Sequence, residues 1–295
     1  EGQDYCKYSG IERDVFLYAR PQSRVRDFRM TAELVNDYKD GELDLDILLH
    51  QPKVGESVEV KVLDEGREIY NRKKSITFTT DTLFSQQEIF PNIRAWNAET
   101  PNTYTLVVST FDTQGKPLET FTHLNGFRTV EMRNGMQMIN GKAVLFKGVN
   151  RHEHDPHKGR TISVASMIHD IQLMKQFNLN GVRNCHYPNY SAWYELCTEF
   201  GLYMVDEANI ESHGMMDHKD GTLANYPDWE RPFMERMSRM IARDRNYSAI
   251  VTWSMGNESG YGKHFDAMYD YTKKIDPPRP VQCEGGGNDA KSDNY

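Results

Sequence analysis

The sequence contains no apolar run that approaches the ~20 residues needed to cross a bilayer, so no helical membrane span and no membrane partner are expected. It is also poor in cysteine. The four cysteines, Cys6, Cys185, Cys197 and Cys283, are far apart and form no CxxC pair. Neither a zinc ribbon nor a disulfide framework is therefore indicated, and the compartment stays open.

Positive charge is scarce as well. The chain has 35 Lys and Arg against 43 Asp and Glu, a net charge of -8, and its basic residues gather only in short clusters such as "NRKK". This balance argues against a nucleic-acid partner and against phosphate binding. The opening "EGQDYC" has neither an initiating Met nor a signal-peptide pattern. We therefore expect the chain to be a piece of a longer protein.

The length of 295 residues predicts two domains. Residues 21–128 contain short alternating segments between turn signals. In one of them Val58, Val60 and Val62 point one way and Glu59 and Lys61 the other, as in a half-buried antiparallel strand. This spacing predicts an immunoglobulin-like β-sandwich. The strands expected are "LDLDILLH", "SVEVKVLD", "SITFTT" and "TYTLVVSTF".

From residue 129 to residue 295, strand patterns alternate with helix patterns. Ser191 is expected to cap one helix at its start, and Gly201 to end it. Repeated strand–helix units predict parallel strands, either in an open sheet or in a (β/α)8 barrel. No GxGxxG follows the first strand, which weighs against nucleotide binding. The expected strands are "AVLFKGVN", "GVRNCH", "LYMVDEA", "IVTWSMG" and "PVQCEGGG", and the expected helices are "SMIHDIQLMKQFN", "SAWYELCTEFG", "DWERPFMERMSRMIARD" and "KHFDAMYDYTKKI".

Polar residues follow each of these strands. In a barrel all such ends converge on one mouth, where barrel enzymes keep their chemistry. Glu258, in "WSMGNESG", is a carboxylate at such a position, and glycoside hydrolysis would require a second carboxylate near it. The residues expected to converge are Asn150, Arg151, His152, Glu153, Arg183, Asn184, His186, Asp206, Glu207, Asn209, Asn257, Glu258 and Glu284, with Glu211 and His213 in the loop after the third strand.

Two long stretches, "NGVRNCHYPNYSAWYELCTEFGLYMVDEANIESHG" and "DRNYSAIVTWSMGNESG", resemble the signature regions of glycoside hydrolase family 2. Within the family, "GVNRHEHDPHKGR" is similar to the bacterial β-galactosidases. The resemblance covers the whole chain. It implies the end of an N-terminal sugar-binding jelly roll in residues 1–20, an immunoglobulin-like β-sandwich in 21–128 and an incomplete (β/α)8 TIM barrel in 129–295.

The resemblance also implies residue roles. Glu258 would be the general acid/base and Asn257 would bind the sugar 2-hydroxyl. His152 and His186 would line the sugar pocket, and Asp4 would hydrogen-bond the sugar hydroxyls from the preceding domain. The implied nucleophile is a glutamate at the end of the seventh barrel strand, which we expect beyond Tyr295. The chain alone is then expected to lack glycosidase activity.

A metal site is implied at Glu211, His213 and Glu258. Glu211 and His213 are two residues apart, so in an extended segment their side chains leave the same face. The resemblance implies Mg²⁺. Because Mg²⁺ prefers oxygen ligands, the histidine keeps Mn²⁺ as an alternative.

The activity implied is the hydrolysis of terminal non-reducing β-D-galactose residues with retention of configuration, in a parent protein expected to be a homo-oligomer. Two alternatives stay open. One is a β-glucuronidase or β-mannosidase of the same family, and the other is a noncatalytic carbohydrate-binding module in which the sandwich binds the sugar.

Overall fold

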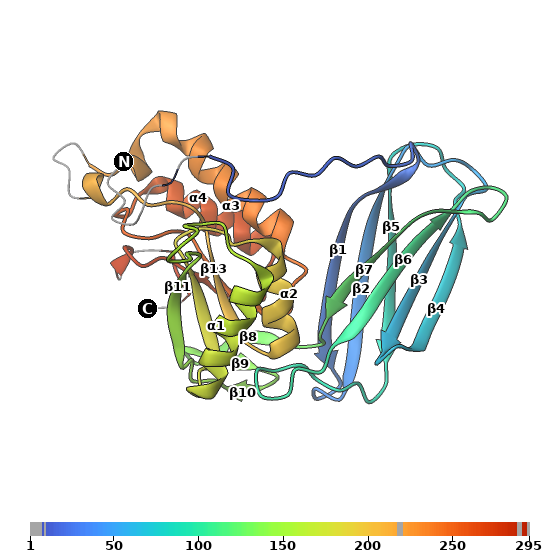
Figure 1. The fold of residues 1–295 in the computed structure, drawn as a ribbon, viewed down its shortest axis with the longest axis horizontal. Coiled ribbons are helices and arrows are strands. Elements are labelled where there is room, and N and C mark those ends of the chain that lie inside the picture. The colour runs from blue at the N-terminus through green and yellow to red at the C-terminus, as the bar shows by residue number, and fades with distance from the viewer. Residues whose placement is uncertain (1–7, 9, 217–220, 288–290, 294–295) are drawn as a thin grey trace.

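The computed structural model describes residue 8 and residues 10–216, 221–287 and 291–293, which form a β-sandwich and a unit of sheet and helices (Figure 1). The described sandwich has a three-stranded and a four-stranded sheet, in the orders β1-β2-β5 and β4-β3-β6-β7, with antiparallel neighbours. This arrangement is immunoglobulin-like. Its strands are β1 (Arg24–Val35), β2 (Asp40–His50), β3 (Ser57–Asp64), β4 (Arg67–Ser75), β5 (Thr82–Phe90), β6 (Tyr104–Phe111) and β7 (Pro117–Asn125).

Alternation along the strands builds the sandwich core. Val58 and Val60 of β3 are fully buried, and Val60 lies opposite the equally buried Val108 of β6. On the other face of β3, Lys61 forms an ion pair with Glu68 at 3.1 Å. The predicted alternation of β3 is therefore confirmed.

The expected strand "SITFTT" is wrong. The strand ends at Ser75, and the backbone of Ile76 turns to pair with Gly55 and Glu56. Residues 76–81 cross from the four-stranded sheet to β5 in the other sheet. The sequence did not predict β4 because this edge strand is polar along most of its length and buries few side chains.

The second unit is built on a five-stranded parallel sheet in the order β11-β12-β13-β14-β15. Four helices connect successive strands, which is the start of a (β/α)8 barrel and confirms the predicted fold class. The strands are β11 (Gly148–His152), β12 (Gly181–Cys185), β13 (Tyr203–Glu207), β14 (Ile250–Ser254) and β15 (Val281–Gln282). The helices are α1 (Val164–Gln176), α2 (Ser191–Phe200), α3 (Glu230–Asp244) and α4 (Lys263–Ile275).

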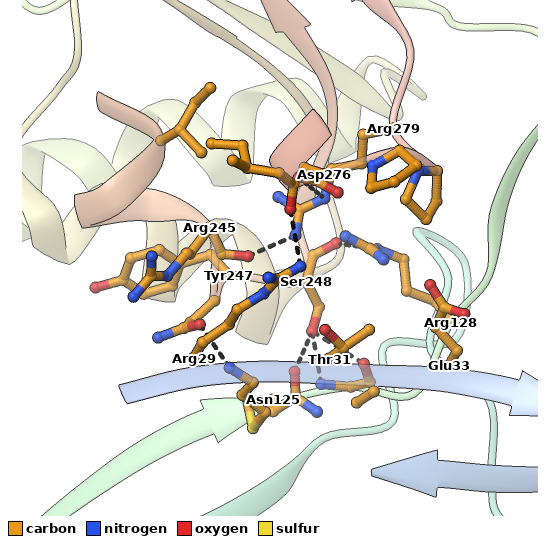
Figure 2. A pocket seen from close by; sticks show the side chains of 18 of the residues that line it. Arg29, Thr31, Glu33, Asn125, Arg128, Arg245, Tyr247, Ser248, Asp276 and Arg279 are labelled. Carbon is orange, nitrogen blue, oxygen red and sulfur yellow. Dashed lines mark hydrogen bonds and ion pairs between the residues drawn. The ribbon is translucent and has the colours of Figure 1, made fainter. Parts of the chain in front are cut away.

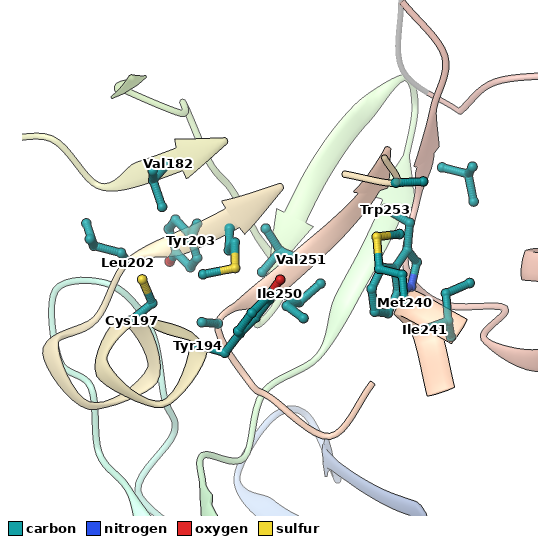
Figure 3. Close-up of a cluster of buried hydrophobic side chains, with 14 of the residues drawn as sticks. Val182, Tyr194, Cys197, Leu202, Tyr203, Met240, Ile241, Ile250, Val251 and Trp253 are labelled. Atoms are coloured by element: carbon teal, nitrogen blue, oxygen red, sulfur yellow. The ribbon is translucent and has the colours of Figure 1, made fainter. Parts of the chain in front are cut away.

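Apolar side chains of the sheet and the helices meet in one core. Figure 3 shows Val182 and Tyr203 of the sheet on the same side as Tyr194 of α2, and Trp253 of β14 beside Met240 of α3. All five are buried. This contact fixes the strands, and therefore the loops that follow them, relative to the helix layer.

A small antiparallel sheet joins the two units: β8 (Val130–Arg133), β9 (Met136–Ile139) and β10 (Lys142–Ala143). The hairpin turns are Asn134–Gly135 and Asn140–Gly141, all four residues with positive φ, as type I′ turns require. Gln137 Nε2 donates to the carbonyl of Val251 at 2.8 Å. This sheet thus covers the amino-terminal end of the barrel strands. It was not predicted from the sequence patterns.

Helix α2 differs from its prediction at one end. Tyr190 is the capping residue and Ser191 is already helical, whereas Gly201 ends the helix with φ 76°, as predicted.

Trp96, from a sandwich loop, is fully buried in the barrel core, and its Nε1 donates to the carbonyl of Thr198 on α2 at 2.8 Å. No helix among the described residues is long and apolar enough to cross a membrane.

Candidate active site

Parallel strands bring the predicted side chains to one edge of the sheet. His152 ends β11 and His186 directly follows β12, and their rings lie edge to face with centroids 5.1 Å apart. The peptide bond between Cys185 and His186 is cis. Glu207 ends β13, and its Oε1 lies 2.7 Å from Nδ1 of His186. The predicted convergence is therefore real for these residues.

A buried network at this edge centres on Glu207, whose side chain is fully buried. Its Oε2 accepts hydrogen bonds from Arg183 Nε at 2.8 Å and from Ser254 Oγ at 2.6 Å. Burial lowers the pKa of Arg183, but the Glu207 carboxylate outweighs this and the net pKa is raised. The network therefore balances one buried negative charge with a neighbouring cation.

The same arginine orients Asn257. Arg183 Nη2 donates to Asn257 Oδ1 at 2.8 Å, and Asn257 is buried. Because the amide oxygen is used in this way, the Nδ2 group is the part of Asn257 that can donate to a ligand.

Glycine lets the chain turn after β14. Gly256 has φ 141°, and a Cβ there would lie 2.6 Å from the carbonyl oxygen of Ile210. That carbonyl accepts a hydrogen bond from the backbone N–H of Asn257 at 2.9 Å. Glu258 follows with φ 38°, and its amide donates to Glu284 Oε2 at 3.0 Å. The turn therefore aligns residues 210–211 with residues 256–257 and brings Glu258 into contact with His213.

Glu211, His213 and Glu258 form the cluster that the sequence predicted. One ligand atom from each lies within 4.8 Å of the others, and His213 Nδ1 is 2.5 Å from Glu258 Oε2. Glu211 is buried, whereas the side chains of His213 and Glu258 are 45% and 34% exposed. Two carboxylates and an imidazole on a partly open surface are a donor set that fits a divalent cation.

Some of the residues expected at the mouth point elsewhere. Successive strand residues face opposite sides, so Asn184 and Asp206 lie under the helix layer and hydrogen-bond each other at 3.0 Å. Burial, together with the nearby Asp244, raises the pKa of Asp206. Arg151 likewise pairs with Asp170 of α1 at 2.8 Å. The prediction that all strand-end residues converge is therefore wrong for these three.

Glu153 takes its cation from outside the barrel. The carboxylate is fully buried and accepts hydrogen bonds from the Tyr190 amide. It forms an ion pair with Arg13, which lies in the extended segment before the sandwich. Sequence reasoning missed this partner because nothing in the local pattern around Arg13 marks a contact about 140 residues away. Asp4, predicted to bind sugar from the same segment, lies outside the described residues.

The sequence is similar to curated β-galactosidases. It is 45% identical to β-galactosidase of Pseudoalteromonas haloplanktis over 97% of this chain and 28% of that protein. It is 43% identical to β-galactosidase of Vibrio vulnificus (strain CMCP6) over 98% of this chain and 28% of that protein. The chain thus spans little more than a quarter of the length of these relatives.

Solved structures show the same fold. The apo structure of Bacteroides uniformis β-glucuronidase 3 matches 89% of this chain and 33% of that chain, with a TM-score of 0.76 and 23% identity. A β-glucuronidase from Ruminococcus gnavus in complex with D-glucuronic acid gives a TM-score of 0.72 and 24% identity, over 88% of this chain and 42% of that chain. At this identity the likeness establishes the fold alone.

Two family models cover nearly all of the described chain. The model described as the TIM barrel domain of glycosyl hydrolases family 2 matches residues 130–295, and a second model of that family matches residues 23–128. These matches account for both the barrel sheet and the sandwich, and they place this chain in glycosyl hydrolase family 2.

Proposed function

We propose that this chain forms part of the active site of a retaining β-galactosidase, which hydrolyses terminal non-reducing β-D-galactose residues. The observation that carries the proposal is the position of Glu258. It stands in a glycine-framed turn at the end of a barrel strand, beside Asn257 and at the same edge of the sheet as His152 and His186. The β-galactosidase relatives, at 40–45% identity, support galactose as the sugar.

Glu258 would act as the general acid/base. It would protonate the glycosidic oxygen as the bond breaks, and later take a proton from the water that attacks the glycosyl enzyme. The Asn257 amide Nδ2 would donate to the sugar 2-hydroxyl, a contact that strengthens as the oxocarbenium-like transition state forms. His152 and His186 would line the sugar pocket. The Glu207 carboxylate accepts a hydrogen bond from Nδ1 of His186, so Nδ1 is the nitrogen that carries the proton.

We further propose that Glu211, His213 and Glu258 hold Mg²⁺, with Mn²⁺ as the alternative that the imidazole favours. The closeness of their ligand atoms supports this. When bound, the ion supplies positive charge beside the acid/base. His213 and Glu258 already lie in contact, so the protein holds two of the three side chains in place.

The retaining mechanism needs a second carboxylate about 5–5.5 Å from the first. Two described glutamates near the mouth already have structural partners. Glu207 is bound by Arg183, His186 and Ser254, and Glu284 accepts from the Glu258 amide. We therefore propose neither of them as the nucleophile. The sugar contact of Asp4 and the homo-oligomeric state stay predictions.

The proposed activity is tested on the polypeptide as the cell makes it, with the nitrophenyl β-D-galactoside, β-D-glucuronide and β-D-mannoside as substrates. We expect kcat/KM to be highest for the galactoside. A preference for the glucuronide or the mannoside would support the alternative enzymes and contradict the proposal. No hydrolysis of any of the three, with retained binding of galactosides, would favour the noncatalytic carbohydrate-binding module.

A further inference from the structure

A cavity of about 340 Å³ lies between the sandwich and the amino-terminal end of the parallel sheet. Its walls are β1, the segment that follows β7, the connection from α3 to β14, and the connection from α4 to β15 (Figure 2). These connections enter the parallel strands, so the cavity is at the end of the sheet opposite the candidate active site.

Arginines dominate the charged lining. Four arginines line the cavity against two carboxylates, Glu33 and Asp276. In Figure 2 the side chains of Arg29, Arg128 and Arg279 enter the same part of the cavity from three different elements. The net charge of the whole chain does not predict such a site, because these arginines come from separate segments that only the fold brings together.

Arg128 is the most deeply buried of them, at 7% exposure. Its Nε donates to the carbonyl of Ser248 at 2.6 Å and its Nη2 to that of Ile250 at 2.7 Å. Both acceptors are neutral, and no carboxylate of the described residues forms an ion pair with this guanidinium. Burial, and then the neighbouring Arg279, lower the pKa of Arg128 to about 9, whereas the charges of Asp276 and Glu33 raise it in part. A buried cation without a directly paired anion is costly, so an anion beside it is favoured.

Arg29 and Arg279 can also donate further hydrogen bonds. Arg279 pairs with Asp276 at 3.3 Å, but that carboxylate also accepts from Trp253 Nε1 at 2.8 Å. Nη1 of Arg279 is buried and has no hydrogen-bond partner among the described residues. Among the described residues, the side chain of Arg29 donates only to the carbonyl of Ile275, at 2.8 Å. Across the described residues, neither Arg29 nor Arg128 forms an ion pair with a carboxylate.

We propose that this cavity binds a small tetrahedral oxyanion, such as phosphate or sulfate, between Arg29, Arg128 and Arg279. One oxyanion can accept charge-assisted hydrogen bonds from several guanidinium groups at once, which balances the positive charge that these arginines bring together. The bound anion would link β1 of the sandwich to the barrel and stabilise their junction. Glu33 lines the same cavity, and its carboxylate opposes the anion. The inference does not depend on the proposed glycosidase activity.

The test is isothermal titration calorimetry of the polypeptide as the cell makes it, at constant ionic strength, with inorganic phosphate, sulfate and glycerol 3-phosphate. We expect phosphate and sulfate to bind and to raise the Tm by about 2–4 °C at saturation. Binding of the ester as tightly as phosphate would identify a phosphate monoester as the natural ligand. Weaker binding of the ester would identify the free ion.

Three variants locate the site. Arg29→Gln changes an exposed residue that lines the cavity, so the protein should still fold, and we expect the Kd for phosphate to rise about fivefold. Glu33→Gln removes the opposing charge and should lower the Kd. The matched control is Arg26→Gln, also on β1 but outside the cavity lining, which should leave the Kd unchanged.

Two results would overturn the proposal. One is the absence of phosphate and sulfate binding to the wild-type protein at about 10 mM ligand, a concentration far above ordinary specific affinities. The other is an equal effect of Arg29→Gln and Arg26→Gln, which would show general attraction of anions to the surface. Neither result bears on hydrolysis of the nitrophenyl sugars, so failure here is distinct from failure of the proposed function.

Discussion

The two units of this chain bury different chemistry. The sandwich core is built from alternating apolar residues such as Leu45, Ile47 and Val60, and among its described residues no charged side chain is completely buried. The barrel unit also buries charged groups completely, among them Glu153 and Glu207. The apolar core depends on packing, whose loss is graded with the volume removed. A buried ion network depends on every partner being present. Removing one partner leaves a buried charge unpaired, and the free energy lost is larger than the free energy that the ion pair contributed. The barrel should therefore be the less tolerant unit.

The largest expected stability effect is that of Glu207→Gln. The change leaves Arg183 without its buried anion and should lower the free energy of unfolding by about 3–5 kcal/mol. Urea denaturation gives this value. The control is Glu59→Gln on the outer face of β3, for which a change within about 0.5 kcal/mol is expected. A loss below about 1 kcal/mol for Glu207→Gln would remove the contrast between the two units.

The next effect concerns the metal cluster. Glu211→Gln keeps the size of the side chain but removes one charged ligand, and we expect Mn²⁺ affinity to fall more than about tenfold. Electron paramagnetic resonance of Mn²⁺ measures this without an activity assay. Glu230→Gln, on the exposed start of α3, is the control. Unchanged Mn²⁺ affinity in Glu211→Gln would show that the cluster holds no cation.

A smaller effect is expected in the sandwich core. Ile47→Val removes one methylene from a fully buried position and should cost about 0.5–1.5 kcal/mol of unfolding free energy. Ile89→Val, at a position 48% exposed on β5, should have little effect. A cost above about 3 kcal/mol at Ile47 would mean that the sandwich is no more tolerant than the barrel.

The smallest effect depends on pH. Burial raises the pKa of Glu33, although Arg128 lowers it in part. The folded protein then holds this proton more tightly than the unfolded chain, so the stability that protonated Glu33 contributes is lost as pH rises through the raised pKa. Glu33→Gln should be more stable than wild type at about pH 7, by less than about 1 kcal/mol, and equal to it at about pH 4.

Urea denaturation at the two pH values measures this difference. Glu65→Gln, 78% exposed at a turn, is the control and should show no pH-dependent change. The prediction would be contradicted if the stability of Glu33→Gln relative to wild type were greater at the lower pH than at the higher pH.

Local patterns predicted much of the fold. The alternation in β3 and the bounds of α4 were predicted, because each depends on residues near one another in sequence. The strands β1, β4, β5 and β7 of the sandwich and the small sheet β8–β10 were not predicted. Strand β4 has no apolar alternation, and the small sheet consists of strands of two to four residues whose Asn-Gly turns were not recognised.

At the candidate site, the family resemblance predicted Glu211, His213 and Glu258, and the structure brings them together. The contact of Arg13 with Glu153 was not predicted. Nor was the arginine-lined cavity around Arg128. These contacts join segments about 100 residues or more apart, and no spacing within one segment encodes them.

The most direct test of the account is the substrate dependence of Glu258→Ala in the polypeptide as the cell makes it. If Glu258 is the general acid, lactose cleavage should slow by about 10²–10⁴-fold, because its leaving group must be protonated. Cleavage of a nitrophenyl galactoside should slow less, and azide should restore turnover and yield the β-galactosyl azide of retained configuration. Equal losses on both substrates without azide rescue would contradict the account. An azide product of inverted configuration would instead identify Glu258 as the nucleophile.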